Sequence, residues 1–219
     1  MATPPGDNPL GAEPIEEGLP DFGHPITVFV DTCVFMSMNF AFGGALLKAL
    51  LAGVERGDIY FVISEITRRE VLSNLIAGVD AAKTAIESFR KKAKVLQGLP
   101  GHSLAAVFKE PDWIETKEDL RSAWEQFLKA GKAEVLPIDG REASGVFDDY
   151  FAHKAPFGGR VKKCEFPDAF VVRALQSFTN KHNCKIVVVS NDKDFQAACE
   201  DAPSLIWCPY LNKVLEHSS

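Results

Sequence analysis

Residues 26–31 read I-T-V-F-V-D, and residues 185–190 read K-I-V-V-V-S, followed by N-D-K-D-F. Each stretch is a short run of β-branched and apolar residues next to an acid, a pattern typical of fully buried parallel strands. Further runs of this kind occur at 59–63, 134–138 and 205–208, and amphipathic segments separate them. Strands that alternate with helices predict an α/β fold with three layers (α/β/α), in which a central parallel sheet of about five strands carries helices on both faces.

The spacing of apolar residues predicts helices over 42–56, 64–75, 80–97, 116–131, 141–153 and 167–180. Residues 98–112 contain Gly, Pro and His and are expected to form a loop, so 98–131 is a candidate helical insertion. Residues 1–25 are rich in Pro and Gly, and we interpret them as a flexible acidic leader. This leaves 26–219 as one domain.

The charge and cysteine content exclude several classes of protein. The chain of 219 residues has a net charge of −6, and the leader contains acids but no Lys or Arg, so the rest is nearly neutral. Binding of long nucleic acid by bulk charge alone is therefore excluded. The five cysteines form no C-x-x-C pair, which argues against a disulfide framework or a zinc site. With no signal peptide and no apolar run of membrane-spanning length, we expect a cytoplasmic protein that does not contact membranes.

Acidic residues gather where the predicted strands end and the following helices begin. Because the carboxyl ends of parallel strands meet at one edge of a sheet, these side chains are expected to lie near one another. Such a cluster repels itself unless a cation neutralises it, and Mg²⁺ and Mn²⁺ prefer oxygen ligands. Each acid alone is also compatible with a helix N-cap. The residues are Asp31, Glu65, Glu70, Glu165, Asp168, Asp192 and Asp194.

Four segments in this order resemble the PIN domain, a Rossmann-like nuclease fold found in VapC-type toxins and in RNA-processing proteins. They are V-F-V-D-T-C-V-F (28–35), I-S-E-I-T-R-R-E-V (63–71), E-F-P-D-A-F-V-V-R-A-L (165–175) and V-V-V-S-N-D-K-D-F (187–195). The K-x-E-F-x-D-A pattern of 163–169 differs from the typical VapC form and is similar to a less studied branch of the family.

The resemblance implies a Mg²⁺- or Mn²⁺-dependent endoribonuclease that cleaves single-stranded RNA by metal-activated water. It makes Asp31, Glu70, Asp168 and Asp192 the catalytic and metal-binding acids, with Asp194 as a further ligand. Glu65, Glu165 and Arg69 are secondary candidates. By the same resemblance, the chain is a candidate toxin, with an antitoxin or another regulatory protein and a second copy of itself as candidate partners.

Substrate contacts are expected from hydroxyl and basic residues near these acids. The resemblance gives Ser190 a role in orienting the site, and Thr32 follows the first acid. Between 154 and 163 the chain has no acid, and its basic residues are either a solvated loop or contacts to phosphate. These basic residues are Lys154, Arg160, Lys162 and Lys163.

Other functions remain open or are excluded by residue type. A dehalogenase-type phosphatase needs a second acid two residues after the first, where this chain has Cys33. A dinucleotide-binding protein needs G-x-G-x-x-G after the first strand, which is absent. Two alternatives stay open: a catalytically silent protein- or RNA-binding module, and a nuclease that acts on single-stranded or structured DNA.

Overall fold

The computed structural model describes residues 24–97, 103–138, 140–157 and 165–218. Its strands are β1 (Ile26–Val30), β2 (Ile59–Ser64), β3 (Glu134–Leu136), β4 (Ile186–Val189) and β5 (Leu205–Cys208). They form one sheet of order β3-β2-β1-β4-β5, in which every pair is parallel. From β1, strands β2 and β3 extend the sheet in one direction, and β4 and β5 extend it in the other. Strands β1 and β4 are therefore neighbours at its centre. The three-layer parallel fold expected from the sequence is confirmed.

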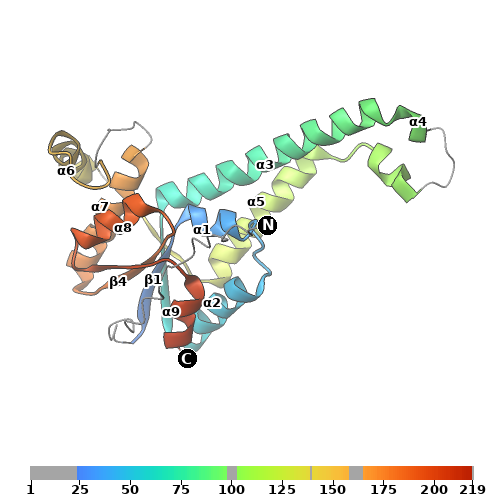
Figure 1. The fold of residues 1–219 in the computed structure, drawn as a ribbon. Helices are drawn as coiled ribbons and strands as arrows, with labels where there is room; N and C mark the ends of the chain where they lie inside the picture. Colours follow the sequence, from blue (N-terminus) through green and yellow to red (C-terminus); the bar gives the residue numbers. More distant parts are fainter. Residues whose placement is uncertain (1–23, 98–102, 139, 158–164, 219) are drawn as a thin grey trace, which may run out of the picture.

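The helices cover both faces of this sheet (Figure 1). Their bounds are α1 (Thr32–Ser37), α2 (Ala45–Arg56), α3 (Glu65–Lys92), α4 (Lys94–Gln97), α5 (Trp113–Ala130), α6 (Gly140–Phe151), α7 (Phe166–His182), α8 (Lys193–Glu200) and α9 (Leu211–His217), with a 3-10 helix η1 (Ser103–Phe108). None of the described helices is long and apolar enough to cross a membrane.

The hydrophobic core has two halves, because successive residues of a strand point to opposite faces. Val28 and Val30 of β1 pack with α2, α5 and α9, in a cluster that includes the fully buried Trp124. Phe29 of β1 points the other way and packs with residues of α7 and α8, among them Phe195 at a ring distance of 6.2 Å. All five residues of β1 are buried, which explains its continuous apolar run.

Helix α3 corrects the sequence-based expectation of two helices over 64–75 and 80–97. It is one helix of 28 residues that continues to Lys92. Gly78 lies inside this helix on the exposed side, while Leu75 and Val79 form a buried stripe on the side facing α5. A glycine inside a helix costs only ~1 kcal/mol, which this packing outweighs.

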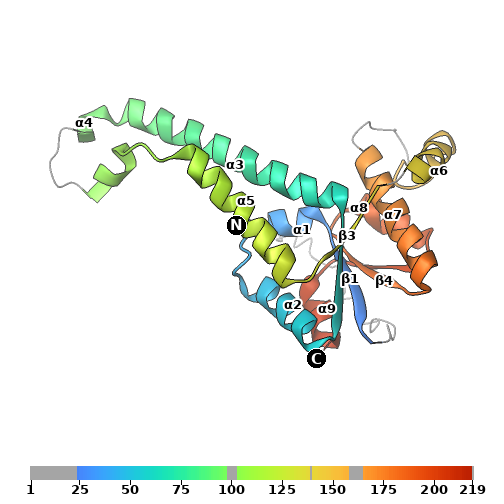
Figure 2. The same cartoon turned by 180° about the vertical axis from the view of Figure 1, so that it is seen from behind.

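The far half of α3 projects from the body of the protein together with α4, η1 and the start of α5. Figures 1 and 2 show this projection as a long arm on one side of the sheet. The other end of α5 returns to the core, where Trp124, Phe127 and Leu128 are buried. The helices α1 and α9 were not expected from the sequence, and both are short.

Candidate active site at the carboxyl edge of the sheet

Asp31 lies immediately after β1, at the centre of the sheet. It is the N-cap of α1, and its Oδ1 accepts a hydrogen bond of 2.6 Å from the Thr32 amide. Its side chain is buried, with only 7% of the residue exposed. Burial raises the pKa of Asp31 above 3.8, and hydrogen bonds oppose that rise. The carboxylate is therefore kept in an environment that disfavours its charge unless donors or a cation compensate.

Two uncharged donors hold the other oxygen of Asp31. The Ser190 hydroxyl donates to Oδ2 at 2.8 Å, and the Cys33 thiol donates to the same oxygen at 2.8 Å. Ser190 is fully buried at the end of β4, and its Oγ also accepts from the Asp192 amide at 3.1 Å. Ser190 thus ties the ends of β1 and β4 together and orients Asp31.

From the sequence we expected Cys33 to lie next to the site in a packing role, and its hydrogen bond to Asp31 was not expected. Burial and the neighbouring Asp31 charge raise the pKa of the Cys33 thiol to about 12. The thiol therefore stays protonated at neutral pH and acts as a hydrogen-bond donor rather than as a nucleophile. The sequence signal for this contact was the position of Cys33 two residues after Asp31. A side chain in the first turn of a helix can contact the side chain of the N-cap residue.

Thr32 connects Asp31 to the second acid. Its hydroxyl donates to Oε2 of Glu70 at 2.9 Å, across from α1 to α3. Burial raises the pKa of Glu70 above 4.5, the Thr32 hydrogen bond opposes this, and the charge of Asp31 adds to it. We expected Thr32 to contact substrate, whereas here its side chain is occupied in positioning Glu70.

Asp168 lies in the first turn of α7, just after Pro167. Burial, and after it the charges of Asp31, Glu70, Asp192 and Asp194, together raise its pKa from 3.8 to about 7. Asp168 is therefore within electrostatic range of all four other acids. Since α7 follows no strand directly, this convergence of α1, α3, α7 and α8 comes from tertiary packing.

Asp192 and Asp194 complete the cluster at the start of α8. Asp192 is the N-cap, and its Oδ1 accepts from the Asp194 amide at 2.7 Å. Its capping role and its place in the cluster are compatible, because its charge also raises the pKa of Asp31. The structure thus brings together the five acids that the sequence analysis placed at the metal site.

Comparison with protein-family models identifies residues 28–195 as a PIN domain. This match covers most of the chain and includes all five acids. The chain belongs to the PIN domain family. Comparisons with curated proteins and with solved structures found no match. PIN domains have a nuclease-type fold, are generally nucleases and typically depend on divalent metal ions.

The other candidates of this PIN domain lie outside the cluster or have other contacts. Arg69 forms an ion pair with Glu65 one turn earlier on α3, and Arg68 is held by both oxygens of Glu125 at 2.8 Å. Glu165 is buried at the N-terminus of α7, with 4% of the residue exposed.

The expected basic loop falls partly outside the described residues. Arg160, Lys162 and Lys163 lie there, so their relation to the acids stays a prediction. Lys154 lines a separate cavity of about 560 Å³, beside Asp149 and Arg173. Those two residues pair with each other through Arg173 Nε at 2.8 Å.

The donor set suits a hard divalent cation. In the described part of the chain, no three His, Cys, Asp or Glu side chains are close enough to hold one metal ion as they stand. Nevertheless, the cluster consists of carboxylates, and burial together with their mutual repulsion raises the pKa of Asp168. Carboxylate oxygens are the ligands that Mg²⁺ and Mn²⁺ prefer. Carboxylate ligands fit a divalent ion. For three or more of them to bind the same ion, their side chains must come closer to one another.

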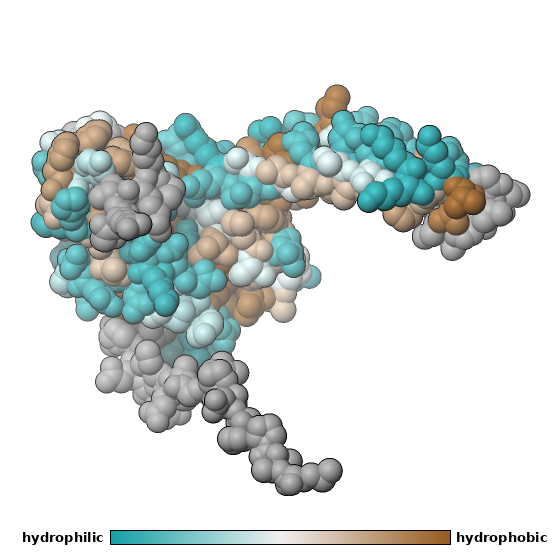
Figure 3. All heavy atoms as spheres, turned by 45° about the horizontal axis from the view of Figure 1, so that its top comes forward, coloured by the Kyte–Doolittle hydropathy of each residue, from teal (hydrophilic) through white to brown (hydrophobic). Residues whose placement is uncertain are grey.

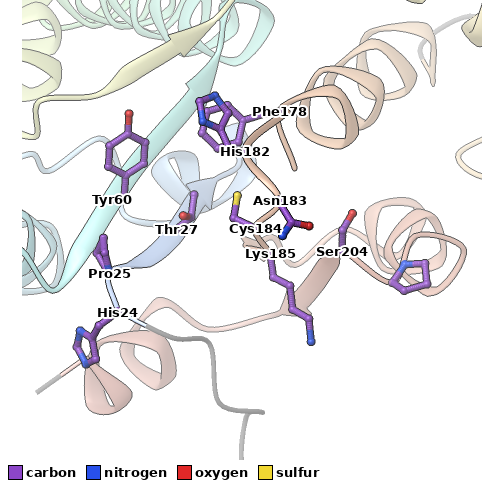
Figure 4. A pocket seen from close by; sticks show the side chains of 11 residues that line it. His24, Pro25, Thr27, Tyr60, Phe178, His182, Asn183, Cys184, Lys185 and Ser204 are labelled. Carbon is purple, nitrogen blue, oxygen red and sulfur yellow. The ribbon is translucent and has the colours of Figure 1, made fainter. Parts of the chain in front are cut away.

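The larger described cavity lies at the opposite edge of the sheet. It has a volume of about 770 Å³ and is lined by residues at the amino ends of the strands, such as Pro25, Tyr60 and Lys185. Figure 4 shows Thr27, Cys184 and Ser204 around the same cavity. Among the described residues that line it, none carries a carboxylate. Because ligands of open parallel sheets bind at the carboxyl ends of the strands, this cavity is not the active site.

Proposed function

We propose that this PIN domain is a Mg²⁺- or Mn²⁺-dependent endonuclease that hydrolyses phosphodiester bonds of single-stranded RNA. The observation that carries the proposal is the convergence of five acids at the carboxyl edge of the sheet. Four of them act together on the fifth, Asp168, whose pKa is raised by burial and then by their charges to about 7. A fold that keeps repelling carboxylates together loses stability, and a bound cation offsets that loss.

Asp31, Glu70, Asp168 and Asp192 are the residues that would hold the ion, with Asp194 beside them. A divalent ion bound there supplies positive charge to the phosphate and lowers the pKa of a water molecule. The protein contributes the orientation of the acids. Ser190, Cys33 and the Thr32 amide direct their hydrogen bonds at Asp31, and the Thr32 hydroxyl directs one at Glu70.

We expect water to attack phosphorus while the 3′-oxygen leaves, which gives a 5′-phosphate and a 3′-hydroxyl and does not involve the ribose 2′-hydroxyl. A 2′-deoxy substitution at the cleaved position should therefore not stop the reaction. This distinguishes the proposed enzyme from contaminating ribonucleases that use the 2′-hydroxyl. The toxin role, the antitoxin and the homodimer remain predictions from the family resemblance.

The test uses labelled single-stranded RNA and DNA with the full chain, in Mn²⁺ and in EDTA. Wild type is compared with Asp31→Asn and Asp168→Asn, and with Asp148→Asn as a matched control on an exposed residue of α6. We expect cleavage that EDTA abolishes, that both site variants lose, and that Asp148→Asn retains. Titration calorimetry of Mn²⁺ into the same proteins should show binding that only the two site variants weaken.

Three outcomes would contradict the proposal in different ways. Cleavage that persists in Asp168→Asn would show that the site is assigned wrongly. Mn²⁺ binding without cleavage of any strand would favour the silent binding module. Cleavage of DNA but not RNA would retain the metal site and replace the substrate.

A further inference from the structure

The arm begins at the candidate active site. Helix α3 carries Glu65 and Glu70 in its first two turns and continues for 28 residues to Lys92. At ~1.5 Å per residue the helix is ~42 Å long. Figures 1 and 2 show that it runs along the edge of the body next to α1 and then projects beyond it. One rigid element thus joins the catalytic edge to the far end of the arm.

Specific contacts hold η1 and α5 against α3 within the arm. Arg90 donates from Nε to the Val107 carbonyl at 2.6 Å and also binds the Lys109 carbonyl and the Glu110 carboxylate. Nearer the body, Lys117 of α5 pairs with Asp80 of α3 at 2.6 Å. The rings of Phe89 and Phe108 pack at 6.4 Å. The arm is therefore a built structure, and its end has a defined position relative to Glu70.

The end of α3 is a basic surface without acidic partners. Lys91, Lys92 and Lys94 are exposed, and among the described residues none of them forms an ion pair. The chain from 88 to 97 contains no acid. The acids around them are Glu87, one turn earlier on α3, and Glu110, which is held by Arg90.

The described arginines are already neutralised. Every arginine whose side chain is described is paired with an acid. The pairs are Arg56–Asp58, Arg68–Glu125, Arg69–Glu65, Arg90–Glu110, Arg121–Glu118 and Arg173–Asp149. Free positive charge in the described part of the chain therefore comes from lysines, and Lys91, Lys92 and Lys94 gather on about one helical turn.

We propose that Lys91, Lys92 and Lys94 bind the phosphate backbone of single-stranded RNA, at a distance from the carboxylate cluster where the RNA is cut. This inference rests on the proposed nuclease function. The cluster itself repels phosphate, and the domain without its leader is nearly neutral, so affinity must come from a local basic surface. Figure 3 shows mostly hydrophilic side chains along the arm when it is viewed from this edge. Lysine contacts of this kind position a strand without reading its sequence.

The geometry sets the length of RNA that can use both sites. Lys91 follows Glu70 by 21 residues on the same helix, which corresponds to ~32 Å along its axis. A stacked strand covers that distance with about nine nucleotides at ~3.4 Å each, and an extended strand with fewer. An RNA of about four nucleotides cannot occupy the cluster and reach the lysines. The lysines should therefore matter for long substrates only.

The experiment compares the triple variant Lys91→Ala/Lys92→Ala/Lys94→Ala with a control of equal charge change. The control is Lys48→Ala/Lys129→Ala/Lys181→Ala, three exposed lysines that lie on other helices and form no ion pair among the described residues. Fluorescence anisotropy measures binding of labelled oligouridylates of about 20 and about four nucleotides, in EDTA to prevent metal-dependent cleavage. Each measurement is repeated over a range of salt concentrations.

For the longer RNA we expect the arm variant to bind at least about 10-fold more weakly than the control variant. Its plot of log K against log salt should be flatter by about 2, since each phosphate contact on a single strand contributes ~0.7. Cleavage of the short RNA in Mn²⁺ should be equal in the two variants. Equal binding of the long RNA by the two variants would overturn the inference. So would a loss of affinity of the arm variant for the short RNA that equals its loss for the long RNA.

The two proposals fail in distinguishable ways. If wild type cleaves RNA and the arm variant behaves as the control does, the nuclease stands and the arm inference falls. If wild type cleaves nothing but the arm variant alone loses RNA binding, the nuclease proposal falls and the RNA-binding surface stands.

Discussion

Replacing Asp168 by Asn should stabilise the metal-free protein. The substitution keeps the shape of the side chain and removes its charge. In the folded protein the pKa of Asp168 is raised to about 7 from 3.8, first by burial and then by the charges of Asp31, Glu70, Asp192 and Asp194. Ionised Asp168 therefore opposes folding at neutral pH, and Asn does not.

The size of the effect follows from the difference between the two pKa values. The rise from 3.8 to about 7 corresponds to at most ~4 kcal/mol, at ~1.4 kcal/mol per pKa unit. Asp168 is partly exposed, so water and salt screen part of the repulsion, and we expect a gain of about 1–2 kcal/mol. For a protein of this size such a gain raises the melting temperature by about 3–6 °C.

The sign of the pH dependence distinguishes this cause from others. An acid whose pKa is raised on folding binds more protons in the folded state, so the protein loses stability as pH rises between the two values. Below pH 3.8 Asp168 is neutral in both states, and the variant should equal wild type. The difference should grow through this range and level off above about pH 7.

Thermal or urea unfolding of both proteins in EDTA, from pH 4 to pH 8, measures the difference. Asp148→Asn is the matched control, because Asp148 is exposed on α6. The reasoning is refuted if the gain of Asp168→Asn does not depend on pH, or if Asp148→Asn gives the same gain. Adding Mn²⁺ should reverse the order of stability, because an ion at ~100 times its Kd stabilises wild type by ~2.7 kcal/mol and the variant less.

Three further perturbations test the parts around the cluster. Ser190→Ala removes a donor from Asp31, so the affinity for Mn²⁺ should fall by about 10–100-fold in calorimetry. Thr32→Val keeps the shape but removes the donor to Glu70, so the pKa of Glu70 should rise further, measured by NMR titration. Arg90→Ala releases η1, so amides of η1 should exchange with deuterium faster while the sheet stays protected.

Much of the carboxyl edge of the sheet could be predicted from the sequence because its elements are local. Strands β1 and β4 are fully buried, which requires continuous apolar runs, and an acid follows each of them closely. Parallel strands then place Asp31 and Asp192 at one edge without further information. The same argument located Ser190 at the end of β4.

The rest depends on contacts between elements far apart in the chain. The Thr32 hydroxyl meets Glu70 across 38 residues, and no pattern within either segment indicates that pair. The sequence analysis divided helix α3 into two helices over 64–75 and 80–97, whereas packing against α5 keeps the helix continuous. The arm follows from that continuity, so it too was beyond prediction from local pattern.

The groups next to the cluster differ in how far they offset its negative charge. Three uncharged donors hold Asp31, and one holds Glu70. Hydrogen bonds of this kind orient a carboxylate and stabilise its charge in part, but they add no positive charge. The two nearest arginines of α3 are bound elsewhere, Arg69 to Glu65 and Arg68 to Glu125.

An arginine inside the cluster would have formed a stable ion pair with the acids, as Arg173 of α7 does with Asp149 of α6. Such an ion pair would also occupy the carboxylate oxygens of the cluster. In the proposed enzyme, these oxygens bind the cation that contacts the phosphate of the substrate. Uncharged donors orient the acids, and the adjacent arginines pair with other acids, so neither group neutralises the cluster. If the proposed divalent ion binds there, it offsets the stability that Asp168 costs the metal-free protein.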